Sequence, residues 1–203
     1  MEKLIASFLT LLFLNSVSAG DINESNFLEF LSKKNFITAE FIQTTFNNGQ
    51  ERKIKGEIKA NRRGMFKVVY QEPLNEIISS NGRQLFRLDR EIEQLDISEI
   101  DATFFESPIG IFSSNREELE DIFSVKECLN DQEVVTCVLE PKTEGSFLKL
   151  ASIELNNNEL SSLVYFDTFE QKVILDFSFV SWDKILDNAF ILEIPEGIDV
   201  VNH

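Results

Sequence analysis

The amino-acid sequence predicts an α+β fold in which one antiparallel β-sheet forms most of a single domain. Eleven or twelve short runs show the two-residue alternation, or the β-branched and aromatic content, of strands, and turn residues separate them. The pattern contains no long helices of the kind that connect parallel strands, so we expect neighbouring strands to be antiparallel. Helix signals are confined to a short segment near residue 27 and to residues 97–123.

The first 19 residues are predicted to be a signal peptide. Lys3 supplies a positive charge, residues 4–14 form an apolar core, and Val17-Ser18-Ala19 is a cleavage signal before Gly20. A membrane anchor is the alternative, but it needs about 20 apolar residues. Removal of these 19 residues from the 203 leaves 184, so residues 20–203 are expected to form one ordinary domain.

After the signal peptide, one short helix and a closely spaced series of strands are expected. Asn23 or Ser25 is a candidate cap for a helix in which Phe27, Phe30 and Leu31 share one face. The dipeptide Asn81-Gly82 is typical of a type I′ hairpin turn. The predicted strands in this half of the chain are residues 37–46, 53–60, 66–70, 76–80, 83–89 and 91–96.

The pattern changes to short helices between residues 97 and 123. Asn115 and Glu118 have the spacing of a capping box. Leu119, Ile122 and Phe123 would give this helix an apolar stripe. The strands predicted after it are residues 124–129, 133–139, 147–155, 159–167, 171–181 and 189–194.

The two cysteines, Cys128 and Cys137, flank the turn of a predicted hairpin. An even number of cysteines in an exported protein suggests a disulfide, and a cross-strand bridge is sterically plausible here. Closing so short a loop would contribute about 2–3 kcal/mol in the chain-entropy model. The alternative is a pair of free thiols that pack as small apolar side chains.

Charge and composition argue against several classes of function. A formal net charge of −16 argues against binding to nucleic acid and to anionic lipid surfaces. The single histidine is the terminal residue His203, which argues against a histidine-activated nucleophile and a histidine-based zinc site. A catalytic carboxylate pair remains compatible with 35 acidic residues, but none stands in the apolar setting typical of a catalytic acid. We therefore expect no enzymatic activity, no cofactor and no metal.

Five motifs occur in a fixed order along the mature chain. They are Phe41-x-Gln43, the run from Gly56 to Pro73, Pro108-Ile109-Gly110, Leu139-Glu140-Pro141-Lys142 and the closing segment 190–200. This ordered set, which covers nearly the whole mature chain, resembles the LolA family, the periplasmic lipoprotein carriers of Gram-negative bacteria. The chain departs from the family in three places: Arg63 replaces a proline, Val68 replaces a tryptophan, and Glu170 replaces a turn glycine.

The resemblance implies an unclosed half-barrel of about eleven strands whose concave face is covered by a helical lid over an apolar cavity. It implies that the cavity is lined by Phe66, Val68, Tyr70, Phe104, Phe105, Ile109 and Phe112. It also implies that Arg62 holds the lid through hydrogen bonds to backbone carbonyls of the lid loop, a role that suits the five donors of arginine. Arg63 could share that contact. The residues alone favour the alternative that Arg62 is a solvated turn residue beside Arg63.

The function that the resemblance implies is transport of acylated lipoproteins between the inner and outer membranes. Cargo would come from an ATP-driven release complex of the inner membrane and pass to an outer-membrane receptor, with the carrier acting as a periplasmic monomer. The receptor itself has a similar fold but needs a lipidated cysteine after its signal peptide, where this chain has Gly20. Two alternatives keep the fold: carriage of another amphiphile, and sensing of stray lipoproteins.

Overall fold

The computed structural model describes residues 22–47, 49–100 and 102–203, so the predicted signal peptide lies outside the described residues. The described chain forms one 12-stranded sheet in the order β12-β6-β5-β4-β3-β2-β1-β11-β10-β9-β8-β7. Every neighbouring pair is antiparallel except β12 with β6. The outer strands β12 and β7 do not pair with each other. This confirms the predicted unclosed, mainly antiparallel fold.

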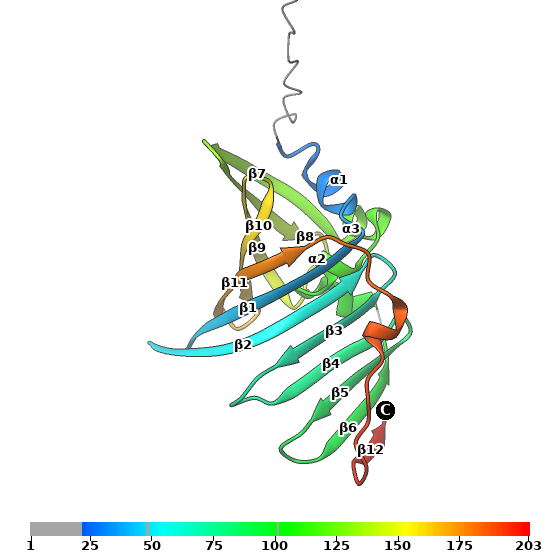
Figure 1. The fold of residues 1–203 in the computed structure, drawn as a ribbon. Coiled ribbons are helices and arrows are strands. Elements are labelled where there is room, and N and C mark those ends of the chain that lie inside the picture. Colours follow the sequence, from blue (N-terminus) through cyan, green and yellow to red (C-terminus); the bar gives the residue numbers. More distant parts are fainter. Residues whose placement is uncertain (1–21, 48, 101) are drawn as a thin grey trace, which may run out of the picture.

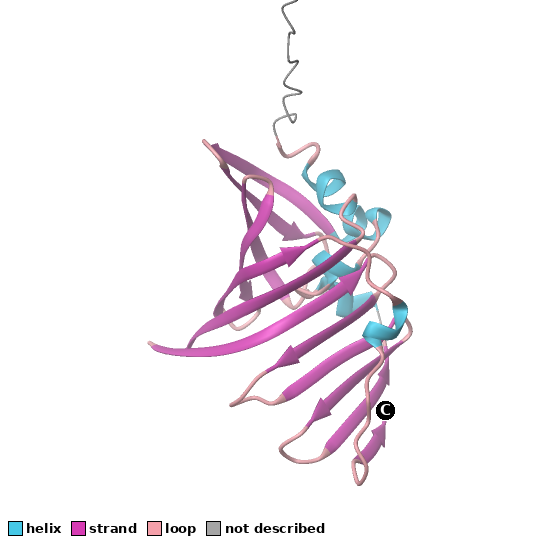
Figure 2. Cartoon of the chain, in the orientation of Figure 1, coloured by secondary structure: helices cyan, strands magenta, loops and turns pink. Residues whose placement is uncertain are grey.

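The sheet bends strongly, and the helices α1, α2 and α3 lie together on its inner side (Figures 1 and 2). The strands are β1 (Phe36–Asn47), β2 (Gln50–Asn61), β3 (Met65–Tyr70), β4 (Glu76–Asn81), β5 (Gln84–Asp89), β6 (Gln94–Glu99), β7 (Phe123–Asp131), β8 (Val134–Pro141), β9 (Leu148–Asn156), β10 (Glu159–Asp167), β11 (Lys172–Ser181) and β12 (Asp199–Asn202). The helical segments are α1 (Phe27–Ser32), η1 (Ala102–Glu106), α2 (Gly110–Ser113), α3 (Arg116–Ile122) and η2 (Asp187–Phe190). None of the helices in the described ranges is both long enough and apolar enough to cross a membrane.

The alternation that predicts β2 also sets the inner face of the sheet. Ile54, Gly56 and Ile58 are buried, whereas the charged residues between them are exposed. Gly56 lies directly opposite Phe41 of β1. A Cβ at Gly56 would overlap the Phe41 ring and lie 2.7 Å from the carbonyl oxygen of Val69. The missing side chain therefore lets an aromatic ring lie flat against the middle of the sheet.

Of three local predictions, for two helix caps and one turn, the structure confirms one and contradicts two. The capping box is confirmed, because the side chain of Asn115 accepts from the Glu118 amide and the Glu118 carboxylate accepts from the Asn115 amide. The N-cap of α1 is Asn26, so the prediction of Asn23 or Ser25 is wrong. The turn after β4 is not type I′: of its two central residues, Gly82 and Arg83, only Gly82 has a positive φ, at +88°. Glycine at the first central position of a two-residue loop is the type II′ preference.

The strand predicted over residues 189–194 is wrong. The chain leaves the sheet after β11, forms η2, and then crosses the outer face of β3–β6 before β12 pairs with β6 (Figure 1). Leu192 and Ile198 of this segment pack against a small outer cluster formed by Ile77, Leu88 and Leu95. The alternation of apolar residues in this segment therefore arises from packing onto a sheet face, without strand pairing. We call residues 183–198 the C-terminal strap.

The main hydrophobic core lies on the opposite, inner face of the sheet. It joins buried side chains of α1, α2 and α3, such as Phe27, Ile111 and Leu119, to the inner faces of β1, β2, β3, β8, β9 and β10. Since the helices share this core, their position over the hollow is fixed by apolar burial as well as by hydrogen bonds.

Candidate apolar cavity and its lid

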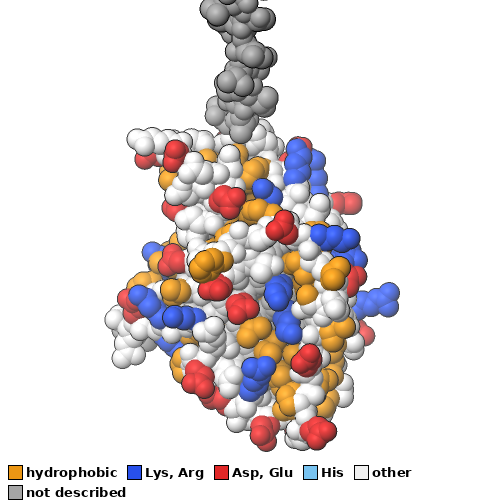
Figure 3. Space-filling view, in the orientation of Figure 1, with side chains coloured by type: hydrophobic (Ala, Val, Ile, Leu, Met, Phe, Trp, Pro, Cys, Tyr) orange, Lys and Arg blue, Asp and Glu red, His pale blue; other side chains and the backbone are white. Residues whose placement is uncertain are grey.

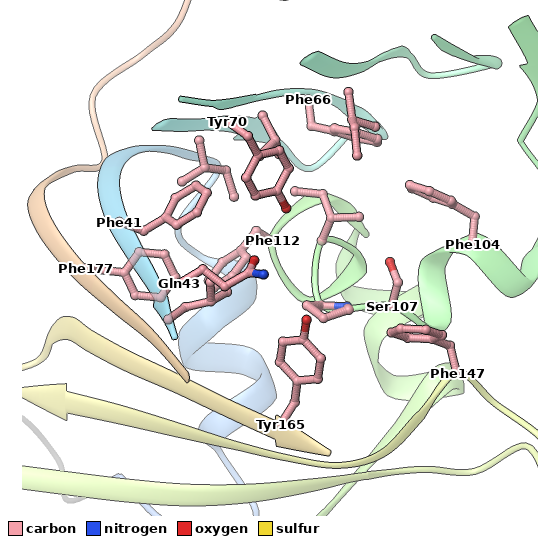
Figure 4. Close-up of a pocket in the computed structure, with 16 residues that line it drawn as sticks. Phe41, Gln43, Phe66, Tyr70, Phe104, Ser107, Phe112, Phe147, Tyr165 and Phe177 are labelled. Carbon is pink, nitrogen blue, oxygen red and sulfur yellow. The ribbon is translucent and has the colours of Figure 1, made fainter. Parts of the chain in front are cut away.

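A cavity of about 280 Å³ lies between the inner face of the sheet and the segment that runs from η1 to α2 (Figure 4). Of its 16 lining residues, 12 are apolar and none is charged. The apolar ones are Phe41, Ile58, Phe66, Val68, Ile78, Phe104, Pro108, Ile109, Phe112, Phe147, Leu175 and Phe177. An engineered apolar cavity of about 150 Å³ holds benzene, so this space would hold roughly a dozen carbon atoms.

Six of the seven residues expected at the cavity line it, and one does not. The lining set includes Phe66, Val68, Tyr70, Phe104, Ile109 and Phe112. Phe66 and Phe104 stack with their ring centroids 5.5 Å apart, joining the sheet to η1. Phe105 is absent from the lining and packs against the turn at Gly64. Adjacent residues of a 3₁₀ helix point in different directions, so Phe104 and Phe105 could not both face the hollow.

Sequence reasoning misses ten lining residues, several of which come from the paired strands β1 and β11. Phe41 of β1 pairs with Phe177 of β11, and the two rings face the same hollow. Leu175, also on β11, and Tyr165 on the neighbouring strand β10 extend this wall of the cavity. The alternation within each strand is visible in the sequence, but the pairing of β1 with β11 joins segments that lie far apart along the chain. Had the pairing of β1 with β11 been known, the alternation of side chains between the two faces of each strand would have identified these residues.

Four lining side chains are polar: Gln43, Tyr70, Ser107 and Tyr165. Their polar ends point into the hollow, with the two tyrosine hydroxyls approaching its centre from opposite walls (Figure 4). Burial, with a smaller effect from the charge of Glu76, raises the pKa of Tyr70 to about 12. Burial likewise raises the pKa of Tyr165. Both hydroxyls are therefore protonated and neutral at physiological pH.

Arg62 connects the sheet to α1 and α2, two of the three helices that cover its inner face and form the lid. Its guanidinium donates four hydrogen bonds to backbone carbonyls, and all four acceptors lie at the C-terminal ends of α1 and α2. The acceptors are Leu31 at 2.9 Å, Lys34 at 3.1 Å, Ile111 at 2.6 Å and Ser114 at 3.0 Å. Carbonyls at a helix C-terminus carry partial negative charge and lack intrahelical donors. A single cation therefore satisfies both helix ends.

Burial lowers the pKa of Arg62 to about 10. The side chain forms none of the ion pairs found among the described residues. It still carries its proton at neutral pH, so the positive charge is balanced only by carbonyl dipoles. The neighbouring amides add to this junction, because Gly64 donates to the Ser113 carbonyl and Arg62 donates to the Asn35 carbonyl.

Arg63 does not share the lid contact of Arg62. Its side chain forms an ion pair with Asp187 in η2, on the strap. The Oδ1 of Asn61 accepts from the amides of Arg63 and Met65, which closes the turn between β2 and β3. The two neighbouring side chains leave that turn toward opposite faces of the sheet.

The two cysteines form a disulfide between β7 and β8, at the outer end of the sheet. Cys128 and Cys137 are directly paired in the strand register, with Cα atoms 4.1 Å apart. Among the described residues, no group of three or more His, Cys, Asp or Glu side chains is arranged to hold a metal ion.

Comparison with known proteins gives one consistent family. The family described as "Outer membrane lipoprotein carrier protein LolA" matches residues 32–192. A protein of Pseudomonas paraeruginosa named outer-membrane lipoprotein carrier protein is 26% identical over 176 residues, which covers 84% of this chain and 83% of the relative.

Solved structures give the same architecture at low sequence identity. An uncharacterized conserved protein from Thermus thermophilus has a TM-score of 0.55 at 10% identity, covering 87% of this chain and 96% of the other. A LolA superfamily protein from Nitrosomonas europaea has a TM-score of 0.50 at 10% identity, covering 85% and 99% of the two chains. These likenesses concern the fold alone.

Proposed function

Because the chain belongs to the LolA family of outer membrane lipoprotein carrier proteins, we propose that it binds the acyl chains of lipoproteins in the cavity beneath its helical lid. The observation that carries this proposal is the uncharged hollow, walled by 12 apolar side chains and roofed by a segment that one arginine holds in place. The role is that of a chaperone in the periplasm, shielding acyl chains from water.

Such a carrier can take up and release acyl chains without any chemical reaction. Burying an acyl chain of about fifteen methylenes is worth about 12 kcal/mol relative to water, and a bilayer core offers nearly the same. Transfer between membrane and carrier is therefore close to balanced in free energy. Small changes in the stability of the closed lid are then enough to decide whether cargo is held or released.

Loading requires the lid to move. The cavity has room for about a dozen carbon atoms by comparison with a benzene-sized cavity, which is less than one long acyl chain. Displacing η1 and α2 from the sheet would enlarge it, and this displacement breaks the Arg62 bonds to Ile111 and Ser114. The closed lid is thus favoured in the empty carrier, and Arg62 favours release of cargo.

In this scheme the carrier receives acylated lipoproteins from an ATP-driven release complex of the inner membrane and passes them to a receptor at the outer membrane. Membership of the family supports both steps. The negative net charge of −16 favours departure from anionic membrane surfaces.

Binding of a synthetic lipopeptide, compared with the same peptide without acyl chains, tests the proposal. We expect displacement of a fluorescent fatty-acid probe only by the acylated form. Leu175→Glu places a charge in the cavity wall and should weaken lipopeptide binding by at least about tenfold. Ile174→Glu lies one residue away on the opposite face of β11 and is the matched control.

Release of lipoproteins from the inner membrane of spheroplasts is the corresponding transport measurement. The wild-type protein and Ile174→Glu should release lipoprotein into the medium, and Leu175→Glu should not. Equal binding of acylated and non-acylated peptide, or full release by Leu175→Glu, would contradict the proposal. Binding of a different amphiphile in preference to the lipopeptide would point to the alternative cargo.

A further inference from the structure

The cavity is not uniformly apolar, and its polar groups are concentrated. Gln43 of β1, Tyr70 of β3, Tyr165 of β10 and Ser107 between η1 and α2 all direct polar atoms into the same space (Figure 4). They come from four separate parts of the chain, so local sequence does not explain why they converge.

These polar groups have few partners within the protein. The Ser107 hydroxyl is buried and accepts or donates no hydrogen bond among the described residues. The amide nitrogen of Gln43 donates to Thr45 at 3.3 Å, at the long end of hydrogen-bond distances. Buried polar groups are normally paired. A ligand atom that pairs with them recovers free energy that an apolar ligand would forfeit.

The charge of the cavity restricts which ligand group fits. None of the described residues that line it is Lys, Arg or His, so a carboxylate or phosphate buried among them would have no counter-charge. Tyrosine is protonated at neutral pH and burial raises the pKa of both residues further, so each hydroxyl can donate a hydrogen bond. Donors without a cation suit a neutral carbonyl oxygen.

We propose that Tyr70, Tyr165, Ser107 and Gln43 form a polar subsite that receives the neutral carbonyl of an acyl ester or amide. The acyl chain then occupies the apolar remainder of the cavity with one end fixed. This inference rests on the proposed function, because it concerns how the same cavity holds its acyl ligand. The subsite would favour esterified or amidated acyl chains, as carried by lipoproteins and glycerolipids, over free fatty acids.

Displacement of a bound fluorescent probe by ligands of matched length tests the subsite. Methyl laurate, laurate and tridecane present a neutral carbonyl, a carboxylate and no polar group. We expect methyl laurate to bind about tenfold more tightly than either of the others, the effect of one or two hydrogen bonds. Two further ligands are monolauroylglycerol and an ester-linked lipopeptide. The one that binds more tightly shows whether the subsite prefers the carbonyl of a glycerolipid or that of a lipoprotein.

Variants that remove single hydroxyl groups connect this preference to the subsite. Tyr70→Phe and Tyr165→Phe keep the rings, including the edge contact of Tyr70 with Phe41 at 5.6 Å, and Ser107→Ala removes the unpaired hydroxyl. Each should reduce the preference for methyl laurate over tridecane while tridecane binds as before. Ser178→Ala, an exposed serine on β11, is the matched control and should leave the preference unchanged.

The outcomes separate the subsite from the carrier function. Probe and tridecane binding that persists without any preference for methyl laurate would overturn the subsite and leave the acyl carrier standing. An unchanged preference in the double variant of Tyr70 and Tyr165 would also overturn it. Absence of binding by every probe and ligand would overturn both.

Discussion

At the scale of single residues, Arg62 is the side chain that ties the sheet to the lid. It replaces four missing helix-end donors with one cation, and no carboxylate of the described residues forms an ion pair with it. Hydrogen bonds to charged groups contribute about 1.5–3 kcal/mol apiece, so the junction is strong when it is formed. It is also breakable, because backbone carbonyls left by the cation can turn to water or to the polar end of a ligand.

Replacement of Arg62 is expected to alter the transport cycle. Arg62→Leu should lower the free energy of unfolding by about 3 kcal/mol and should accumulate loaded carrier, because the closed state loses its advantage. Arg62→Lys should restore only part of the transfer, since an ammonium group lacks the planar fork. Lipoprotein transfer to outer-membrane vesicles measures the effect.

Arg63 supplies the matched control for that experiment. Its ion pair with Asp187 is exposed on the outer face, so Arg63→Leu should transfer cargo at the normal rate, and the double variant should behave as Arg62→Leu alone. Normal transfer by both Arg62→Leu and the double variant would show that Arg62 is only a turn residue.

The two tyrosines give a spectroscopic view of the cavity, because the chain has no others. The pKa of Tyr70 is raised from 10.0 to about 12, so its contribution to stability is complete below pH 10 and is lost as the pH rises through 12. Alkaline titration of the phenolate absorbance should therefore lag behind that of the unfolded protein. The loss of stability between pH 10 and 12 should be smaller in Tyr70→Phe. Titration of both tyrosines near pH 10 in the folded protein would mean that the cavity is open to water.

At the scale of elements, close backbone contacts build the lid. Gly110 begins α2, and a Cβ there would overlap the backbone of Phe105 in η1. The hydroxyl of Ser113 donates back to the Ile109 carbonyl at 3.0 Å, which tightens the same turn. The motif Pro108-Ile109-Gly110 therefore encodes a close approach of two short helices, and not a flexible hinge.

Gly110→Ala is expected to displace η1 from α2. Because the obstructing atoms belong to the backbone, relief requires a shift of the lid, with a cost of about 1–3 kcal/mol typical of overpacking. Thermal unfolding and probe binding measure the two consequences. Gly145→Ala is the control, since its surroundings are open and only its positive φ of +84° causes strain. Equal effects of the two variants would mean that the helices do not need this contact.

The turn between β10 and β11 departs from the family's sequence motif, yet the fold is unchanged. Glu170 stands where the family usually has glycine, and it adopts a φ of +61°. The Asp167 side chain accepts from the amides of Phe169 and Gln171, which holds the turn in place. Side-chain hydrogen bonds to the backbone thus compensate for a residue that disfavours the left-handed region.

At the scale of the whole molecule, the curved sheet buries apolar residues on both faces. The helices cover the inner face, while the strap covers the outer cluster of Ile77, Leu88 and Leu95. Hydrophobic side chains remain visible along the strap, on a face where acidic and basic residues are otherwise interspersed (Figure 3). They include Leu186, Ile191 and Ile194.

Removal of one strap contact is expected to release the strap. Leu192→Asp puts a charge against the outer cluster and should lower the free energy of unfolding by about 2–3 kcal/mol. Ile191→Asp changes the neighbouring side chain, which is 64% exposed, and should change it by no more than about 0.5 kcal/mol. Urea denaturation measures both. A similar loss in the two variants would mean that the strap does not depend on this burial.

The sequence by itself determined the class of the fold, because alternation records which face of each strand is apolar. It also determined the capping box at Asn115 and which residues of β3 share one face, while the resemblance to a family added that this face is inward and that Arg62 is a residue of interest. Each of these features depends on residues within a few positions of one another, where backbone geometry fixes which side chains share a face.

Only the tertiary structure decided which strands became neighbours and which side chains met. The pairing of β1 with β11 brings Phe41 and Phe177 to one hollow, Phe105 turns away to Gly64, and the strap occupies a sheet face where a strand was expected. Such contacts join distant segments, and their free energy comes from the packing of the whole core. A local pattern can show that a residue will be buried, but not against what.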